Sequence, residues 1–488
     1  INMRKKYLIY IPFSVLLTCV LYQLYYTLSF NNFPTITDGA TVLLLGKEVA
    51  GGNVLLRGWE LSTVPFYFTE VVIYALSSLI VGYSKSLAFV IPSILYVVII
   101  WLMFSLSKNK LLSISLLTFF VVFPADMAVT SMLSACIHMG TYAFIFASII
   151  LLEKYDATEN IVNLIIATII SALSLFSDNI SMFIYIIPMI LASTVMFAKH
   201  REKKYLTLAF SAVVSILISK LIKYGFSVQN GFHLPGINDI RVVTYENISN
   251  NINTAIQGTL LFFNANIFGQ PLKLSYDTFS IFSRFLGFLA LIYFAAKRAL
   301  RFRCLSFTDI LIISSIVLML AAYVGSNLPR NIWTIRYLVP VYLMLVIFVS
   351  REKYENKYIL LSVFFAGMAS GVSTINIQES NEKHDQFACI SEKIKQSGGE
   401  FGYATFDYTN SVGIDSTLKI ANIKFENGKV VRDRWLTNNE WYNKGNNFFI
   451  LPDDTQVNIV KTEFGTPHSI EYVCNVFILT YDKNINIE

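Results

Sequence analysis

Charged residues are scarce in this sequence, and their scarcity excludes the most common class of proteins. Asp, Glu, Lys and Arg make up 14% of the 488 residues, against about 25% in an ordinary soluble domain. We therefore expect an integral membrane protein rather than a water-soluble enzyme, with membrane lipid as a partner. We expect no nucleic-acid partner.

Histidine and cysteine are also few, with five of each in the chain. The cysteines include no CxxC pair, and the histidines are scattered. Metal sites built from these residues have characteristic short spacings. We therefore predict no metal ion, and we expect no cofactor.

Long apolar runs are what the chain has in abundance. Hydrophobic residues make up 55% of it, and a bilayer core about 30 Å thick needs about 20 apolar residues per helix. The first run, Tyr7 to Leu28, is too long and too rich in tyrosine for a cleavable signal sequence. We predict an α-helical polytopic membrane protein with about eleven spans: 7–28, 86–106, 111–125, 139–153, 160–176, 180–198, 205–225, 279–296, 307–326, 336–350 and 357–375.

One further apolar run, 66–82, decides the orientation. If it lies along the membrane surface, the basic clusters share one side of the membrane, as the positive-inside rule requires of cytoplasmic loops. If it crosses, four of those clusters move to the other side, so we predict a surface helix. The N-terminus is then cytoplasmic and the C-terminal part periplasmic, in a bacterial inner membrane. The cytoplasmic clusters are Arg4, Lys5 and Lys6; Lys108 and Lys110; Lys199, Arg201, Lys203 and Lys204; Lys297, Arg298, Arg301 and Arg303; Arg351, Lys353 and Lys357.

The outer side of this arrangement carries two long loops, 29–85 and 226–278, and a soluble domain, 376–488. The domain reads as a small α+β unit, with a helix at 384–396 and strands at 401–406, 419–425, 447–451 and 473–481. Asn427-Gly428 is a hairpin turn signal. Cys389 and Cys474 either form a disulfide between the helix and the last strand or remain buried thiols.

The first outer loop contains Asp38, about ten residues past the first span. A carboxylate at the membrane surface is suited to act as a general base toward an acceptor hydroxyl. The alternative is a helix N-cap for the segment Ala40–Val49. Glu70 is a second catalytic candidate in this loop, at the start of the surface helix.

Other candidates in the loop are substrate-binding residues. Arg57 and Lys85 could hold an anionic lipid headgroup, or be solvated charges. Trp59 and Tyr67 are interleaved with the charges, and the run 65–69 is otherwise an aromatic anchor at the membrane interface.

Charges also gather at the outer ends of later spans. Asp126 follows the third predicted span and is a third catalytic candidate. Asp178 is better explained by capping or structural pairing, and His138 by a satisfied core position. Arg330 and Arg336 lie in a loop before the tenth span, where a guanidinium suits bidentate phosphate binding. The alternative for Arg336 is a charge that snorkels to the surface.

These features together resemble the GT-C class of integral membrane glycosyltransferases. The likeness lies in a first span followed by a long outer loop with an early acidic residue and a surface helix. Length, span count and external tail look most like the O-antigen-modifying glucosyltransferases of serotype-converting phages. The similar segments are Asn53 to Phe68, Gly82-Tyr83-Ser84, Ser177-Asp178 and Arg336-Tyr337-Leu338-Val339-Pro340.

The resemblance implies a specific chemistry. Such enzymes transfer a sugar from a polyprenyl-phosphate carrier to an acceptor at the outer face, here a lipopolysaccharide O-antigen. Asp38 would deprotonate the acceptor hydroxyl. Many members carry a second acidic residue directly beside the first, whereas here the neighbours are Thr37 and Gly39. A single base working without a metal pair fits this departure.

Two other classes remain open. A transporter or flippase of lipid-linked sugar would show charges or breaks in mid-span, often in two repeated halves, and the spans here are mostly uninterrupted. An O-antigen polymerase or ligase would depend on loop arginines more than on an early carboxylate. A purely structural membrane protein ranks last.

Overall fold

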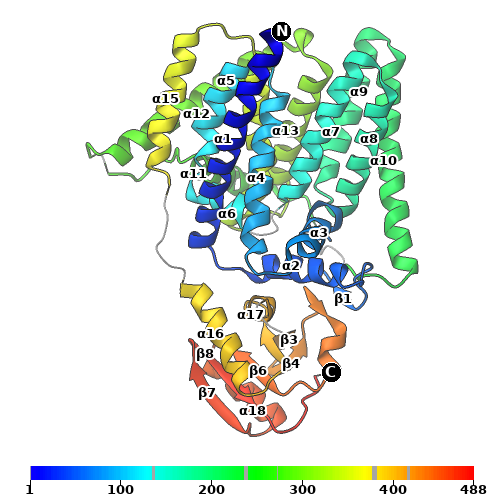
Figure 1. Cartoon of the computed structure of the whole chain (residues 1–488), viewed down its shortest axis with the longest axis vertical. Helices are drawn as coiled ribbons and strands as arrows, with labels where there is room; N and C mark the ends of the chain where they lie inside the picture. The colour runs from blue at the N-terminus through cyan, green and yellow to red at the C-terminus, as the bar shows by residue number, and fades with distance from the viewer. Residues whose placement is uncertain are drawn as a thin grey trace.

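The computed structural model describes residues 2–134, 138–235, 240–271, 273–375, 382–414 and 418–487. Figure 1 shows a domain of packed helices and a smaller part that contains a β-sheet. The smaller part begins at α16. We call the smaller part the tail. The end of the helical domain beside it is the tail-side end, and the opposite end is the far end. The domain junction predicted at 376 lies outside the described residues.

The elements of the helical domain follow one another with short connections. In chain order they are α1 (Asn2–Asn32), α2 (Thr37–Ala50), β1 (Trp59–Glu60), η1 (Tyr67–Val71), α3 (Val72–Val81), α4 (Leu87–Leu106), α5 (Lys110–Leu117), η2 (Thr118–Val122), α6 (Asp126–Leu133), α7 (Met139–Thr158), α8 (Ile161–Ser177), η3 (Met182–Ile186), α9 (Ile187–His200), α10 (Lys203–Val228), α11 (Tyr245–Phe262), α12 (Tyr276–Leu300), η4 (Phe302–Cys304), α13 (Phe307–Gly325), η5 (Ile332–Leu338), α14 (Val339–Ser350) and α15 (Lys357–Val372).

Several of these helices are apolar and long enough to cross a membrane, so the predicted type of fold is confirmed. Within the described ranges there are seven such segments, or eight if one bent pair counts as a single span. The predicted number of eleven is not reached by this criterion. The helices α8 and α15 have 17 and 16 residues, and α7 carries Glu153, Lys154 and Asp156 in its last turns.

The run predicted to lie on the surface is short in the structure. It forms η1 and α3, of five and ten residues, which span about 22 Å at 1.5 Å per residue. This is less than the bilayer core of about 30 Å. Gly46 of α2 allows α3 to pack closely, because a Cβ there would lie 2.5 Å from the Cβ of Tyr74. The length agrees with a helix that does not cross.

The predicted span 111–125 corresponds to the continuous pair α5–η2 and extends three residues beyond its end, into a bend. The pair α5–η2 ends at Val122 and α6 begins at Asp126, with a bend of 91° between them. Pro124 causes the break, because it lacks an N–H and disfavours helical geometry in Phe123. The fully buried Arg284 of α12 donates to the freed Phe123 carbonyl at 3.2 Å.

The tail is a six-stranded mixed sheet between two helices. Its strand order is β4-β3-β2-β6-β8-β7, and β2 runs parallel to both β3 and β6. Adjacent residues of β6 face opposite sides: Phe448 packs with Ile390 and Ile394 of α16, while Phe449 stacks on Phe464 of α18. The elements are α16 (Glu382–Gln396), β2 (Phe401–Thr405), α17 (Thr409–Gly413), β3 (Lys419–Glu426), β4 (Lys429–Arg432), β5 (Thr437–Asn438), η6 (Asn439–Asn443), β6 (Phe448–Leu451), α18 (Asp454–Phe464), β7 (Ser469–Val473) and β8 (Val476–Thr480).

The predicted strand 473–481 corresponds to β8 but begins three residues too early, because a tight turn precedes β8. Cys474 and Asn475 have φ values of 54° and 61° and connect β7 to β8. A disulfide joins Cys474 to Cys389, so the bridge ties α16 to this turn rather than to the last strand. The predicted turn at Asn427-Gly428 is confirmed between β3 and β4.

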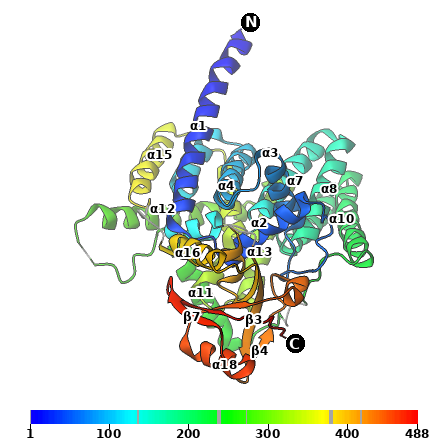
Figure 2. The same ribbon diagram turned by 60° about the horizontal axis from the view of Figure 1, so that its bottom comes forward.

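The tail is fastened to the first loop of the helical domain by the pairing of two short strands; Figure 2 turns the tail toward the viewer. Strand β1 pairs antiparallel with β5, and Trp59 meets Trp441 edge to face at 5.1 Å. Glu60 accepts a hydrogen bond from Asn439 of the tail at 2.7 Å and pairs with His233 at 2.5 Å. This contact joins both long loops to the tail.

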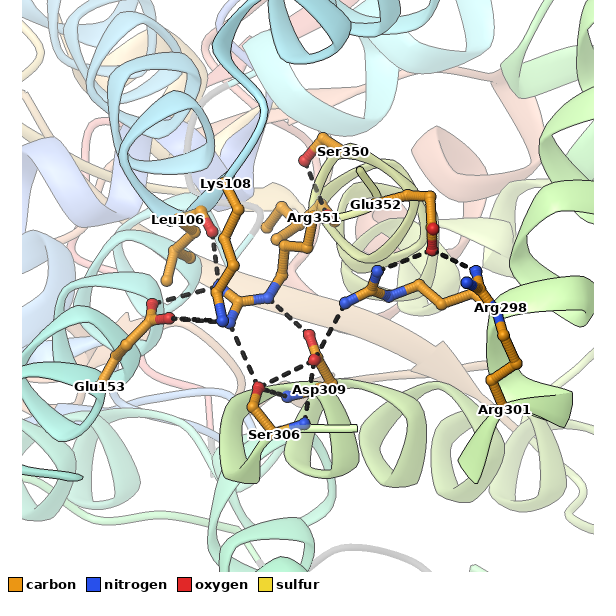
Figure 3. Close-up of polar contacts among 11 residues, drawn as sticks. Leu106, Lys108, Glu153, Arg298, Arg301, Ser306, Asp309, Ser350, Arg351 and Glu352 are labelled. Atoms are coloured by element: carbon orange, nitrogen blue, oxygen red, sulfur yellow. Dashed lines mark hydrogen bonds and ion pairs between the residues drawn. The ribbon is translucent and has the colours of Figure 1, made fainter. Parts of the chain in front are cut away.

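The far end holds a dense ionic cluster around Arg351 (Figure 3). The side chain of Arg351 is fully buried, and it binds Asp309 at 2.6 Å and Glu153 at 2.7 Å. Arg298 bridges Asp309 and Glu352, each at 2.9 Å. We call these five residues the far-end cluster.

Candidate functional site

The start of α2 places Asp38 at the tail-side end. The N-cap residue is Ile36, in an extended conformation without a side-chain cap, and the helix begins at Thr37. The interpretation of Asp38 as the N-cap is therefore wrong, since it lies in the first helical turn. A carboxylate there is stabilised by the positive end of the helix dipole.

The Asp38 carboxylate is half-buried and carries no hydrogen bond from any residue in the described part of the chain. Burial raises the pKa of the Asp38 carboxyl above its usual value, Arg336 opposes this change, and Asp407 adds to it. An unbonded carboxylate with a raised pKa is suited to take a proton near neutral pH.

Arg336 lies in the same region, although it is about 300 residues from Asp38 in the sequence. It lies in η5, whose start is capped by the Asn331 side chain, and Pro340 at the beginning of α14 fixes where the next helix starts. The guanidinium is half-buried and donates no hydrogen bond to the residues that the structure describes. Its positive charge lowers the pKa of the Asp38 carboxyl, so these two predicted residues lie within electrostatic range of each other.

A second polar group lies beside Arg336. His138 Nδ1 is 2.5 Å from Asp178 Oδ2, and the Thr141 hydroxyl donates to the same oxygen at 3.0 Å. The structural pairing expected for Asp178 is therefore confirmed. Tyr142, one turn into α7, lies within electrostatic range of Asp178, Arg336 and Glu70, which places the predicted Glu70 in the neighbourhood of Arg336.

Glu70 owes its position to an unusual backbone. Phe66 has a φ of 47° and precedes the π-helical turn η1, a local feature often found at functional sites. Ser177 holds this turn with two hydrogen bonds of 2.9 Å. Its carbonyl accepts from the Phe66 N–H, and its hydroxyl accepts from the Phe68 N–H. Gly140 permits close packing, because a Cβ there would lie 1.9 Å from the Thr69 carbonyl oxygen.

The tail contributes an acidic residue that the sequence did not indicate. Asp407 lies in the turn after β2, is exposed, and acts on Asp38. Thr37 donates to the Phe406 carbonyl at 2.6 Å, and Asn410 donates to Thr41 at 2.7 Å. These bonds connect segments about 370 residues apart, so no local signal could have paired them.

The other predicted residues lie elsewhere. Trp59 and Tyr67 are buried, at 1% and 3% exposure; Trp59 packs on the tail, and Tyr67 donates to the Val54 carbonyl at 2.6 Å. Four charged residues are exposed, and no contact with Asp38 is described for them: Arg57, Lys85, Asp126 and Arg330. In the described ranges, no three His, Cys, Asp or Glu side chains lie close enough to hold a metal ion.

Among solved structures, the chain is similar to ArnT from Cupriavidus metallidurans bound to undecaprenyl phosphate. The two are 12% identical with a TM-score of 0.57, and the match covers 96% of this chain and 97% of that chain. No family model and no curated protein matches the sequence. This similarity shows that the chain has an ArnT-like fold over nearly its whole length.

Proposed function

We propose that this protein is a GT-C class membrane glycosyltransferase that moves a sugar from a polyprenyl-phosphate carrier to a hydroxyl group of a cell-surface glycan. The electrostatic interaction of Asp38 and Arg336 at the tail-side end, with neither side chain hydrogen-bonded to a described residue, carries the proposal. The ArnT structure that shares the fold was solved with undecaprenyl phosphate, and this supports a lipid-phosphate donor.

Asp38 serves as the general base in this proposal. Its carboxylate takes the proton of the acceptor hydroxyl while the hydroxyl oxygen forms a bond to the anomeric carbon of the donor sugar. General-base catalysis of this kind contributes about 10²- to 10⁴-fold in rate. Because no described side chain donates a hydrogen bond to the Asp38 carboxylate, the lone pairs of its oxygens are available to the acceptor hydroxyl.

Arg336 binds the leaving group. When the bond between the anomeric carbon and the phosphate oxygen breaks, the polyprenyl phosphate gains a negative charge. A guanidinium stabilises that charge and fits two phosphate oxygens at once. The half-buried position of Arg336 strengthens the interaction, because the local dielectric constant is lower than in water.

The proposal keeps the finer features predicted from the sequence. Counting α5–α6 as one crossing and adding α7, α8 and α15 to the seven long apolar segments gives the eleven predicted spans. The N-terminus is then cytoplasmic and the tail periplasmic in a bacterial inner membrane. We propose glucose as the sugar and a lipopolysaccharide O-antigen as the acceptor, as in serotype conversion by bacteriophages.

The test is transfer of labelled sugar from polyprenyl-phosphate-sugar to lipopolysaccharide in membranes. Asp38→Asn at matched expression is expected to lose at least about 10² in rate while retaining binding of undecaprenyl phosphate. Glu48→Gln is the matched control, because Glu48 lies on the same helix, ten residues and about 15 Å further along it. It is expected to transfer at the wild-type rate.

Two outcomes would contradict the proposal in different ways. Undiminished transfer by Asp38→Asn would remove Asp38 from the mechanism and direct attention to Asp126 and Glu70. Absence of transfer by the wild type, across several donor sugars, would favour a flippase or an O-antigen polymerase or ligase.

A further inference from the structure

The turn between β2 and α17 is held directly against the first turn of α2. The Thr37 hydroxyl donates to the Phe406 carbonyl at 2.6 Å and lies 3.2 Å from the Ser411 hydroxyl. The first contact is partly buried and joins the residues directly before Asp38 and Asp407, and the second is buried. The two aspartates are thus fixed on facing segments of different domains.

The helix α17, which follows this turn directly, supplies a second anchor. Asn410 donates both to the Thr41 hydroxyl, at 2.7 Å, and to the Leu436 carbonyl, at 2.8 Å. Thr41 in turn donates to the Thr37 carbonyl. Two anchors one helical turn apart on α2 fix the orientation of the turn as well as its position.

The carboxylate of Asp407 has no packing role that would explain its position. It is exposed, and within the described ranges neither a hydrogen bond nor an ion pair reaches it. Arg336 is the cation near Asp38, and Asp407 adds a second negative charge to the same region. An ionised carboxylate only accepts hydrogen bonds, so this arrangement fits a ligand rich in hydroxyl donors.

We propose that Asp407 binds the acceptor sugar: it accepts a hydrogen bond from one hydroxyl of the sugar while Asp38 deprotonates another, so that the tail forms part of the active site. This inference rests on the proposed function and adds to it a residue that contacts the acceptor. Hydrogen bonds to charged groups are stronger than neutral ones, and the energy of one corresponds to about tenfold or more in affinity.

The expected signature separates the acceptor from the donor. Asp407→Ala should raise the acceptor KM about tenfold and leave the donor KM unchanged, because the phosphate lies at Arg336. Asp407→Asn should have a smaller effect of the same kind, and Asp407→Glu should restore most of the acceptor affinity. A residue that only supports the fold would change both KM values or neither.

The pH dependence gives a second readout. Two charged groups from other elements act on Asp38: Arg336 of η5 and Asp407 of the tail. Asp38 acts as a base only when ionised, and Asp407 raises the pKa of Asp38. Removing Asp407 should therefore shift the acid limb of the transfer profile to lower pH.

The experiment uses the full chain in nanodiscs, with polyprenyl-phosphate-glucose and O-antigen polysaccharide as probes. Acceptor binding is also measured without turnover, in the presence of undecaprenyl phosphate. Asp482→Ala is the matched control, since Asp482 is a tail aspartate with an 82% exposed side chain that pairs with His468. Thermal unfolding of each variant shows whether it is folded.

A selective rise in acceptor KM together with a shifted acid limb supports the proposal. If Asp407→Ala behaves like Asp482→Ala while the wild type transfers sugar, the inference is overturned and the proposed function stands. If the wild type binds O-antigen but Asp407→Ala binds it equally well, the inference is overturned by binding alone. If the wild type neither transfers sugar nor binds the acceptor, both proposals fall.

Discussion

One helix connects two polar regions that have opposite properties. The helix α14, Val339–Ser350, begins three residues after Arg336 and ends one residue before Arg351. The twelve residues of this helix span about 18 Å, so the two arginines lie beyond its opposite ends. The comparison of these arginines, and of the acids around them, distinguishes a structural cluster from a candidate site.

Arg351 uses its donors within the protein. Its nitrogens bind Asp309, Glu153, the Leu106 carbonyl and the Ser306 hydroxyl, at 2.6 to 3.4 Å. Burial alone would penalise such a charge, and the surrounding acids compensate for it. The far-end cluster leaves little capacity for a ligand.

Arg336 and Asp38 are the reverse case. Both are half-buried, and neither side chain has a hydrogen bond to a residue that the structure describes. Partly buried charges without bonded partners cost free energy in the protein alone. Such a cost is expected where a substrate supplies the missing partner. We therefore assign the chemistry to the tail-side end, where the charged side chains lack bonded partners, and not to the far-end cluster.

The largest expected effect is on stability at the far end. Arg351→Ala leaves Asp309 and Glu153 without their main partner, and breaking a buried pair in this way costs about 3–5 kcal/mol. The free energy of unfolding in detergent measures it. Lys108→Ala is the matched control, because Lys108 lies 3.9 Å from the same Glu153 with a 52% exposed side chain, and it should cost less than about 1 kcal/mol. Equal losses in the two variants would contradict the structural role of Arg351.

The next effect is on transfer at the tail-side end. Arg336→Ala should lower the transfer rate about 10²-fold or more, as for other donors that stabilise a leaving charge. Its free energy of unfolding should remain close to that of the wild type, because no described hydrogen bond is lost. Arg303→Ala, an exposed arginine just after α12, serves as the control for loss of a positive charge. A destabilised Arg336→Ala protein with normal transfer per folded molecule would reverse the comparison.

The sequence predicts much of the fold because apolar runs have a direct physical meaning in a membrane. The runs at 86–106 and 205–225 correspond to α4 and α10 within a few residues. The predicted span 111–125 matches α5–η2 and ends at the bend that contains Pro124, a residue that breaks helices. The turn at Cys474-Asn475 lacks glycine, so the alternating pattern continued through it.

The site is only partly predictable for a different reason. Asp38 and Arg336 stand out as charges next to apolar runs, and the structure places them together. Asp407 and the bond from Thr37 to the Phe406 carbonyl depend on how two domains dock, which local composition does not encode. The basic residue Arg351 was used only to assign orientation, because its acidic partners come from α7 and α13.

The third effect concerns the pH dependence of transfer. Burial raises the pKa of Asp38, and Arg336 opposes that change. The acid limb of the wild-type profile should therefore lie above the usual pKa of an aspartate. Arg336→Gln should move the residual activity's acid limb to higher pH, whereas Arg303→Gln should not move it. An acid limb that is the same in both variants would separate Arg336 from Asp38.

The smallest expected effect probes the far-end cluster without removing a charge. Ser306 caps α13 by accepting from the Asp309 N–H and by donating to the Asp309 carboxylate at 2.8 Å. Ser306→Ala should cost about 1 kcal/mol in the free energy of unfolding, the usual value for a lost N-cap, with transfer unchanged. Ser362→Ala is the matched control, because Ser362 is exposed and bonds only one carbonyl of its own helix. A loss of unfolding free energy as large as that of Arg351→Ala would mean that the hydroxyl, rather than the ion pairs, organises the cluster. Reduced transfer in a stable Ser306→Ala protein would show that the far end takes part in function.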